Sequence, residues 1–595
     1  MISPCSKQRM MTFLYVILGV VLAMAGMGQG ALAVAKENHR VLDPPKRRQP
    51  HLILLLADDF GWANVGFHRS DGSKEVQTPN LDFLASSGVI LDRFYTYKIC
   101  SPSRSSLQSG RLPVHVNTVN MAPEAFNPRD LVSGYSGIPR NMTCLAEKLK
   151  TEGYRTFATG KWDAGMATPR HTPKGRGYDD FLGYFHHANN YWDYGLELPA
   201  TGEIDVCGNQ LLDIWTNKGP FEVREKKVYE EELFELHTIE RGILAHDTSS
   251  AKPLFLFHSF HLCHTPLQVP DQVLKLFSFI EHSKRRRYAA MAYHMDRTVG
   301  RIVDALKSKR MYDESLILFF SDNGGPVYDP GSANNWPLRG GKYSDFEGGI
   351  RVNAIAAGGI IPSSRRGSVS HDLIHISDVY ATFIRLAHFG YNTPKIDQKE
   401  LAKVLHDRDA ESANLPPVDA KDTVWQAIVG SGGDGPVGEI RAEIHISTQC
   451  LIQGRYKLIV GRQGMDMHQG PYFPNSTGPQ PLFPDIDIRK KAFYKDCGPA
   501  GCLFDVFADP TEQIDLASSV PQLRKQMLDR LAELNKSEFA PNRGRPMRLA
   551  CHVGHFKWKG HYGPFLELES FGEAGQELIE LDDEELDGDR NSRLS

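Results

Sequence analysis

Short apolar runs alternate with amphipathic stretches over most of the chain. Four runs, at residues 51–56, 154–159, 254–260 and 316–320, have the length and apolar content of strands buried in a parallel sheet. Helical patterns lie between them, at about 144–150 and 288–307, and Thr78-Pro79 and Gly88 mark the start and end of another helix, with Thr78 as its capping residue. Strands that alternate with helices predict an α/β domain with a large, mostly parallel sheet.

The pattern changes at about residue 400, where shorter apolar segments at 443–447 and 456–460 precede a helical segment near 522–534. These segments predict a smaller C-terminal α+β domain with an antiparallel sheet. A single core stops growing at roughly 250–300 residues, so a chain of 595 residues is expected to form two domains. We place the larger domain at 51–400 and the smaller one at 401–565, followed by an acidic, disordered tail at 566–595.

The N-terminus predicts entry into the secretory pathway. Lys7 and Arg9 precede an apolar run at 10–27 and the small-residue triplet 31–33, a pattern typical of a signal peptide at 1–33, which a linker at 34–50 follows. The alternative is an uncleaved signal anchor. After cleavage we expect no membrane contact, and most of the eight cysteines beyond the signal should form disulfides in an oxidising compartment. A net charge of −4 without a basic stripe argues against nucleic acid as a partner.

Polar residues follow all four predicted strands of the large domain. Ligands of open parallel sheets bind beyond the carboxyl ends of the strands, so these residues predict a site, although each one alone could be a loop or capping residue. Three carboxylates and one amide among them form an oxygen set suited to Ca²⁺ or Mg²⁺, and Ca²⁺ tolerates irregular cages better. The residues, in strand order, are Asp58 and Asp59, then Lys161, then His261 and His264, then Asp322 and Asn323.

The segment 100–104 reads Cys-Ser-Pro-Ser-Arg and predicts the start of a helix, where unpaired N–H groups attract an anion. Arg104 lies one turn into that helix. A lone cysteine is more often buried or disulfide-bonded, but the surrounding pattern favours chemistry at Cys100. The histidines at 258, 261 and 264 could suggest zinc; on a strand followed by a turn they need not face one another, so we predict no zinc site.

The same segment matches the C-x-P-x-R signature of the type I sulfatases, and the chain resembles that family from about 51 to 516. Residues 335–340 look most like the arylsulfatase B branch. The resemblance implies an alkaline-phosphatase-like α/β sandwich. The supporting matches are Ala57-Asp58-Asp59-Phe60-Gly61-Trp62, Thr78-Pro79-Asn80, Gly160-Lys161-Trp162, His264-Thr265-Pro266-Leu267, Ser321-Asp322-Asn323-Gly324-Gly325, Lys342 and Glu347-Gly348-Gly349.

The resemblance further implies that a formylglycine-generating enzyme oxidises Cys100 to formylglycine, whose hydrate takes up the sulfuryl group and later releases sulfate by hemiacetal collapse. One Ca²⁺ would be held by Asp58, Asp59, Cys100, Asp322 and Asn323. Arg104 would orient the hydrate, Lys161 and Lys342 would stabilise negative charge, and His264 would protonate the leaving alcohol.

One position departs from the family pattern: Asp163 stands where most relatives have histidine. That histidine is thought to accept the hydroxyl proton during collapse, and a carboxylate can also accept a proton. We therefore expect a sulfatase acting on a sulfated carbohydrate or an aryl sulfate, with Asp163 as a catalytic residue. The alternatives are a phosphatase or phosphodiesterase of the same fold, and a pseudo-sulfatase that binds sulfated glycans without turnover.

Overall fold

The computed structural model describes residues 48–69, 73–196, 207–208, 211–223, 228–328, 332–393, 396–405, 415–430, 441–471 and 494–567. The predicted signal peptide, most of the linker and nearly all of the acidic tail lie outside these residues. Among the residues described, no helix combines the length and the apolar character needed to cross a bilayer.

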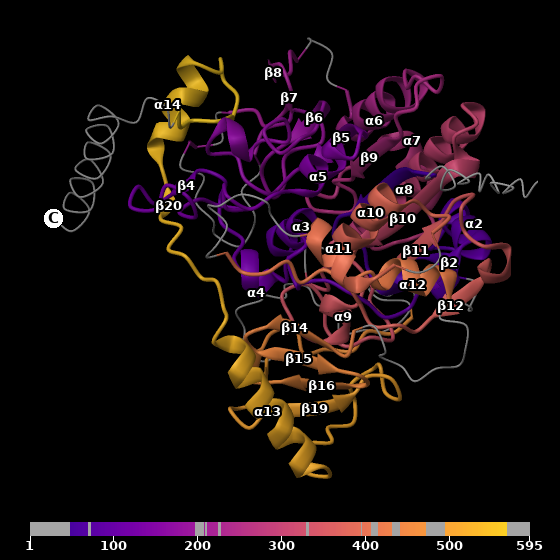
Figure 1. Cartoon of the computed structure of the whole chain (residues 1–595), viewed down its shortest axis with the longest axis vertical. Helices are drawn as coiled ribbons and strands as arrows, with labels where there is room; N and C mark the ends of the chain where they lie inside the picture. Colours follow the sequence, from indigo (N-terminus) through magenta and orange to yellow (C-terminus); the bar gives the residue numbers. More distant parts are fainter. Residues whose placement is uncertain are drawn as a thin grey trace, which may run out of the picture. The chain divides into compact units, whose positions relative to one another are not determined.

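A ten-stranded sheet forms the centre of the large part (Figure 1). Strand β1 (His51–Ala57) pairs in parallel with both β9 (Leu254–Ser259) and β10 (Ser315–Ser321). Strands β5 (Arg155–Lys161) and β6 (Asp180–Tyr184) extend the parallel set beyond β9. The sheet order is β12-β2-β11-β10-β1-β9-β5-β6-β7-β8, and the remaining strands are β2 (Val89–Leu91), β7 (Trp215–Thr216), β8 (Gly219–Pro220), β11 (Ala354–Ala357) and β12 (Ser368–Ser370).

Helices cover both faces of this sheet. Alternate residues of β1 point to opposite faces and are buried in two different cores. Leu52, Leu54 and Leu56 belong to one core and Ile53 and Leu55 to the other, as the two-residue repeat of a strand requires. The first core includes α3 (Cys100–Ser109), α5 (Leu145–Thr151) and α10 (Asp378–Phe389); the second includes α2 (Pro79–Ser87) and α8 (Ser283–Ser308). The predicted α/β class with a mostly parallel sheet is confirmed.

Helix α2 is present as predicted, but the prediction that Thr78 caps it is wrong. Thr78 makes no side-chain cap bond, and the N–H groups of Asn80 and Leu81 instead donate to Asp296 of α8, at 3.2 and 2.8 Å. Gly88 ends the helix at a φ of −128°, outside the left-handed region. Its need for glycine is steric, since a Cβ there would lie 2.2 Å from the Ala356 carbonyl oxygen.

The predicted antiparallel sheet is also confirmed. It consists of β14 (Glu443–Ser447), β15 (Cys450–Gln453), β16 (Tyr456–Ile459) and β19 (Cys502–Asp505). Helix α13 (Pro521–Asn535) lies along this sheet in Figure 1, and its Met527 and Leu531 pack on Leu451, Leu458 and Leu503. The shorter elements are α4 (Pro113–Val116), α6 (Glu230–Leu236), α7 (Asp271–Leu274), α9 (Glu347–Ile350), β3 (Phe94–Tyr95), β13 (Ile374–His375), β17 (Arg462–Gln463) and β18 (Lys495–Asp496).

Parts of the C-terminal segment join the large core. Helices α11 (Gln398–Leu405) and α12 (Thr423–Val429) contribute to the α10 core, and β20 (Arg545–Pro546) pairs with β4 (Ala125–Phe126). The predicted domain boundary at 400/401 stays a prediction.

Half of the eight cysteines form disulfides, so the expectation that most would pair is wrong. The bonds are Cys207–Cys551, which reaches α14 (Arg548–Phe556), and Cys497–Cys502. The other four, which are buried outside these bonds, are Cys100, Cys144, Cys263 and Cys450.

Candidate active site

The carboxyl ends of β1, β5 and β10 bring the predicted polar residues into one buried cluster. Lys161 Nζ donates to Asp58 Oδ2 at 2.7 Å, and Asn323 Nδ2 donates to Asp59 Oδ1 at 2.7 Å. Lys342, from the loop beyond β10, donates to Asp59 Oδ2 at 2.8 Å. The convergence follows from the parallel arrangement, because neighbouring strands end at the same edge of the sheet.

The backbone at Asp59 allows two consecutive carboxylates to serve the same cluster. Successive side chains of a strand point to opposite faces, but Asp59 has a φ of +56°, which breaks the alternation directly after Asp58. Two contacts hold this conformation: the Asp59 N–H donates to Asp322 Oδ1 at 3.3 Å, and the Tyr288 hydroxyl donates to the Asp59 carbonyl at 2.8 Å.

Cys100 lies at the first turn of α3, as its sequence context predicts. Its Sγ lies 3.6 Å from Asp58 Oδ1, and its side chain is buried. Burial raises the pKa of the Cys100 thiol well above its usual range, although Lys161 and Lys342 act in the opposite direction. The unmodified side chain is therefore a neutral thiol, which is a poor nucleophile.

Arg104 connects four strand ends. Its Nε donates to Asp322 Oδ2 at 2.9 Å, one terminal nitrogen donates to Ser259 Oγ at 2.7 Å and to the Lys161 carbonyl at 3.1 Å, and the other lies 3.6 Å from Asp58 Oδ2. Burial opposes its charge, but Asp322 and Asp58 raise the pKa of Arg104 above its usual range. The guanidinium stays charged and neutralises two buried carboxylates.

The donor set fits a hard divalent cation. Ligand atoms of Asp58, Asp59, Cys100 and His264 lie within 4.8 Å of one another. Asn323 Oδ1 is buried and has no hydrogen-bond partner among the described residues, so an oxygen is available for an ion. Burial raises the pKa of Asp58, and a cation would offset that cost of burying its charge. The predicted ligand Asp322 lies beside this group, and the imidazole of His264 is an addition to the predicted oxygen set.

Asp163 lies next to the cluster, paired with a histidine that sequence reasoning did not assign to the site. Its Oδ1 accepts from Ser101 Oγ and lies 2.8 Å from His187 Nδ1, and its Oδ2 lies 3.7 Å from Lys161 Nζ. Burial alone would raise the pKa of Asp163, but His187 and Lys161 lower it below the usual range. The position of His187 shortly after β6, the next strand of the parallel set, was the signal that could have identified it.

The three histidines at the end of β9 have different hydrogen-bond partners, although the rings of His261 and His264 stack with centroids 5.8 Å apart. His258 Nδ1 lies 2.7 Å from Thr238 Oγ1, and His261 Nδ1 lies 2.5 Å from Glu230 Oε1. Only His264 belongs to the group of possible metal ligands found among the described residues. The absence of a zinc site at these histidines stays a prediction.

His264 reaches the cluster through one ring nitrogen. Its Nδ1 donates to the Thr265 carbonyl at 2.6 Å, and its Nε2 lies 3.6 Å from Asp59 Oδ2. Burial, together with the charges of Lys342 and Lys161, lowers the pKa of His264 well below its usual range.

Residues 50–389 match the family described as Sulfatase, which is more than half of the chain. The chain belongs to the sulfatase family. Mouse arylsulfatase J is 31% identical to this sulfatase over 511 residues, which cover 82% of this chain and 76% of that protein. Human N-acetylgalactosamine-6-sulfatase is 30% identical over 348 residues, which cover 57% of this chain and 62% of that protein.

Solved structures share the fold of this sulfatase. The crystal structure of Ps i-CgsB in complex with k-i-k-neocarrahexaose superposes with a TM-score of 0.61 and 26% identity, covering 84% of this chain and 94% of that one. PsFucS1 sulfatase from Pseudoalteromonas sp. gives a TM-score of 0.61 at 24% identity, covering 83% and 92%. The alkaline-phosphatase-like sandwich expected from the sequence is therefore confirmed, as is the enzyme class.

Proposed function

We propose that this sulfatase hydrolyses sulfate esters of sugars, using Ca²⁺ and a formylglycine made from Cys100. The observation that carries the proposal is the position of Cys100 on the first turn of α3, 3.6 Å from Asp58 and beside a cluster with three cationic side chains. The substrate class is supported by the relatives, one of which is named for N-acetylgalactosamine-6-sulfate chemistry and another of which was solved with a neocarrahexaose.

The nucleophile requires the modification, because burial keeps the Cys100 thiol protonated. Formylglycine, when hydrated, supplies one hydroxyl that attacks sulfur and a second whose deprotonation expels sulfate. An ordinary hydroxyl could accept the sulfuryl group but would remain as a stable ester. Arg104 orients the side chain at this position and keeps Asp58 and Asp322 neutralised.

Charge stabilisation comes from the residues around the nucleophile. Asp58, Asp59, Asp322, Asn323 and the modified residue 100 would hold Ca²⁺, which supplies positive charge to the sulfate oxygens. Lys161 and Lys342 each donate to one of the ligand carboxylates, at 2.7 and 2.8 Å. Their ammonium groups remain available in a buried site, where charge–charge interactions are stronger than in water.

Two groups move protons in this proposal. His264 protonates the departing alcohol from one side. On the other side, Asp163 orients His187, whose Nε2 is buried and has no partner among the residues described. The pair supplies an imidazole near Ser101, the neighbour of the nucleophile, and so replaces the histidine that position 163 lacks.

Maturation and location follow from the same proposal. A formylglycine-generating enzyme must act on the exported chain, and the two disulfides support an oxidising compartment. We therefore propose a secreted or lysosomal protein whose N-terminal signal is removed.

The test is peptide mass spectrometry of the segment around Cys100, combined with an assay on a chromogenic aryl sulfate with and without EGTA. We expect an aldehyde in place of the thiol and activity that EGTA abolishes and added Ca²⁺ restores. Phosphate ester hydrolysis without sulfate ester hydrolysis would favour the phosphatase alternative. Modification and glycan binding without turnover would favour the pseudo-sulfatase, and an unmodified thiol in active protein would contradict the proposed mechanism.

A further inference from the structure

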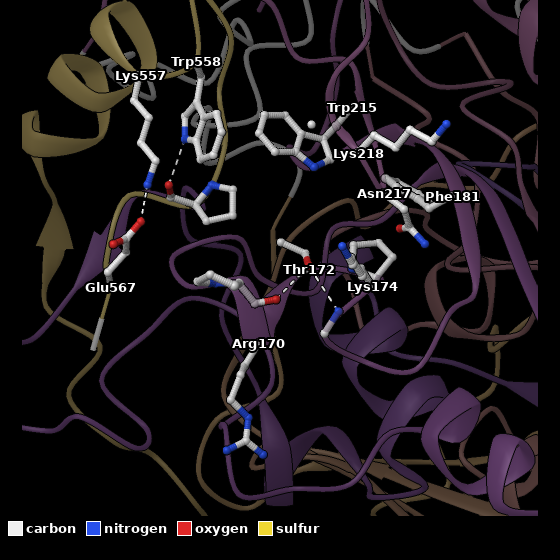
Figure 2. Close-up of a pocket in the computed structure, with 15 residues that line it drawn as sticks. Arg170, Thr172, Lys174, Phe181, Trp215, Asn217, Lys218, Lys557, Trp558 and Glu567 are labelled. Atoms are coloured by element: carbon white, nitrogen blue, oxygen red, sulfur yellow. Dashed lines mark hydrogen bonds and ion pairs between the residues drawn. The ribbon is translucent and has the colours of Figure 1, made fainter. Parts of the chain in front are cut away.

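A cleft of about 490 Å³ lies at the β6–β8 edge of the large sheet (Figure 2). It is enclosed by the loop 169–175, by Phe181 of β6, by residues 215–219 and by the segment that follows α14. None of its lining residues belongs to the catalytic cluster. Its volume lies within the range of about 300–1,000 Å³ that is typical of small-molecule sites.

Two tryptophans form an aromatic wall of this cleft. The rings of Trp215 and Trp558 meet edge to face, with centroids 5.0 Å apart, and they lie beside each other in Figure 2. Trp558 Nε1 donates to the Pro564 carbonyl at 2.9 Å, which fixes the ring. The Cys207–Cys551 disulfide attaches α14 to the segment before β7, so the wall is held in place before any ligand arrives.

The rim of the cleft is cationic, although the chain as a whole carries a net charge of −4. Lys174 and Lys218 are exposed, and neither has an ion-pair partner among the described residues. Lys557 is neutralised by Glu567. In Figure 2 the Arg170 guanidinium extends away from the indoles, so we assign it no contact with a ligand.

One polar acceptor in the wall has no internal partner. Asn217 Nδ2 donates to the Tyr178 carbonyl at 3.0 Å, which fixes the amide. Its Oδ1 is buried and accepts no hydrogen bond within the described part of the chain. The cleft therefore has one fixed amide side chain among its lining residues.

We propose that this cleft binds sugar units of a sulfated oligosaccharide away from the ester that is cleaved. The Trp558 ring, which is partly exposed and packs on the buried Trp215, provides apolar surface for the C–H face of a sugar, and Lys174 and Lys218 pair with sulfate groups. The choice of a sulfated ligand rests on the proposed function, whereas the site itself rests on the geometry. An enzyme molecule that binds a polymeric substrate at both the catalytic cluster and this cleft would stay on that polymer between turnovers.

The test is calorimetric titration of the full chain with a carrageenan hexasaccharide and a chondroitin 6-sulfate hexasaccharide, each with its desulfated counterpart. We expect at least one sulfated probe to bind the wild-type chain. The double variant K174S/K218S should weaken that binding at least about fivefold at low salt. Trp558→Leu, which keeps apolar packing on Trp215 but removes the ring face, should weaken it as well, with thermal melting as the check on folding.

The matched control is K403S/K525S, which removes two exposed lysines that do not line the cleft, with the same change in charge. Equal weakening by the control, equal binding of the desulfated probe, or unchanged affinity in K174S/K218S would overturn the inference. The inference would also be overturned if sedimentation showed that the protein self-associates through this face and calorimetry showed no probe binding.

Activity separates this inference from the proposed function. Hydrolysis of a small aryl sulfate should be unchanged in K174S/K218S, while kcat/KM for a hexasaccharide substrate falls mainly through KM. If the wild-type chain binds the probe at the cleft without hydrolysing any sulfate ester, the proposed function fails and the site stands. If it hydrolyses aryl sulfate but binds no sulfated probe at the cleft, the proposed function stands and the inference about the cleft fails.

Discussion

Asp163 Oδ1 lies 2.8 Å from His187 Nδ1, and this pair borders Ser101 beside the residue we propose as the nucleophile precursor. The carboxylate at the position where the resemblance predicts a histidine therefore has an imidazole beside it. Asp163 stays ionised, because His187 and Lys161 lower its pKa. The substitution is consistent with an active enzyme that carries its proton acceptor on another strand end.

We predict that His187→Ala lowers kcat on an aryl sulfate by about 10²–10⁴-fold, which is the usual contribution of a general base. The first turnover should survive, because the base is needed to expel sulfate after the sulfuryl group has been transferred. Rapid-quench kinetics would measure a burst followed by a slow steady state. The control is His371→Ala, an exposed histidine paired with Asp92. An unchanged steady state in His187→Ala would remove this residue from the mechanism.

Arg104→Lys should destabilise the chain even though the charge is kept. A lysine cannot donate at once to Asp322, Ser259 and the Lys161 carbonyl, so buried acceptors lose their partners. Each buried acceptor that is left unsatisfied costs about 1–3 kcal/mol, and urea unfolding would measure the loss as a lower midpoint. Arg455→Lys, at an exposed pair with Asp505, is the matched control and should change little. Equal midpoints for the two variants would contradict the prediction.

The strand ends could be predicted from the sequence because the rule for open parallel sheets depends only on strand order and direction. Asp58, Lys161 and Asp322 each follow an apolar run, and parallel pairing places them at one edge. The partners of these residues could not be predicted in the same way. His187 and Asp163 are brought together by the loops after β6 and β5, whose paths depend on packing.

Helix ends and disulfides were the least predictable features, for a similar reason. Thr78 has the local chemistry of a cap, yet Asp296, from a helix more than two hundred residues later in the chain, takes that role. The Cys207–Cys551 bond has a sequence separation of 344, and no local pattern indicates it. The cleft beside Trp215 and Trp558 is hidden from sequence reasoning because its two walls come from distant segments.

Glu231 gives a prediction about stability and pH. Burial raises its pKa from the ordinary value of 4.5 to about 8, and its Oε1 accepts from the His261 and Leu262 N–H groups. Between these two pKa values the unfolded chain loses a proton that the folded chain keeps. Its contribution to stability is therefore fully present below about pH 4.5 and is lost as the pH rises towards 8, by up to about 1.4 kcal/mol per pH unit.

Glu231→Gln keeps the Oε1 acceptor and removes the titration. We expect urea unfolding at several pH values to give a flatter profile for this variant than for the wild type across that window. Glu533→Gln, on α13 at an exposed pair with Lys536 just beyond the helix, should leave the slope unchanged. If the free energy of unfolding of Glu231→Gln depends on pH as steeply as that of the wild type, the pH dependence comes from another group.

His264 should make the reaction depend on pH in a way that varies with the leaving group. Nδ1 donates to the Thr265 carbonyl, so the neutral ring carries no hydrogen on Nε2, and it must gain a second proton before it can act as an acid. Burial and the two lysines lower its pKa, so the protonated fraction, and with it kcat/KM on a sugar sulfate, should fall as the pH rises.

A nitrophenolate leaves without a proton, whereas a sugar alkoxide does not. His264→Ala should therefore cost about 10²–10⁴-fold on a sugar sulfate and much less on nitrophenyl sulfate, and the sugar sulfate profile should lose its acidic preference. His555→Ala, on the exposed face of α14, controls for the loss of an imidazole. Equal losses on both substrates would mean that His264 serves the metal group to which its Nε2 lies close, and that another residue protonates the leaving oxygen.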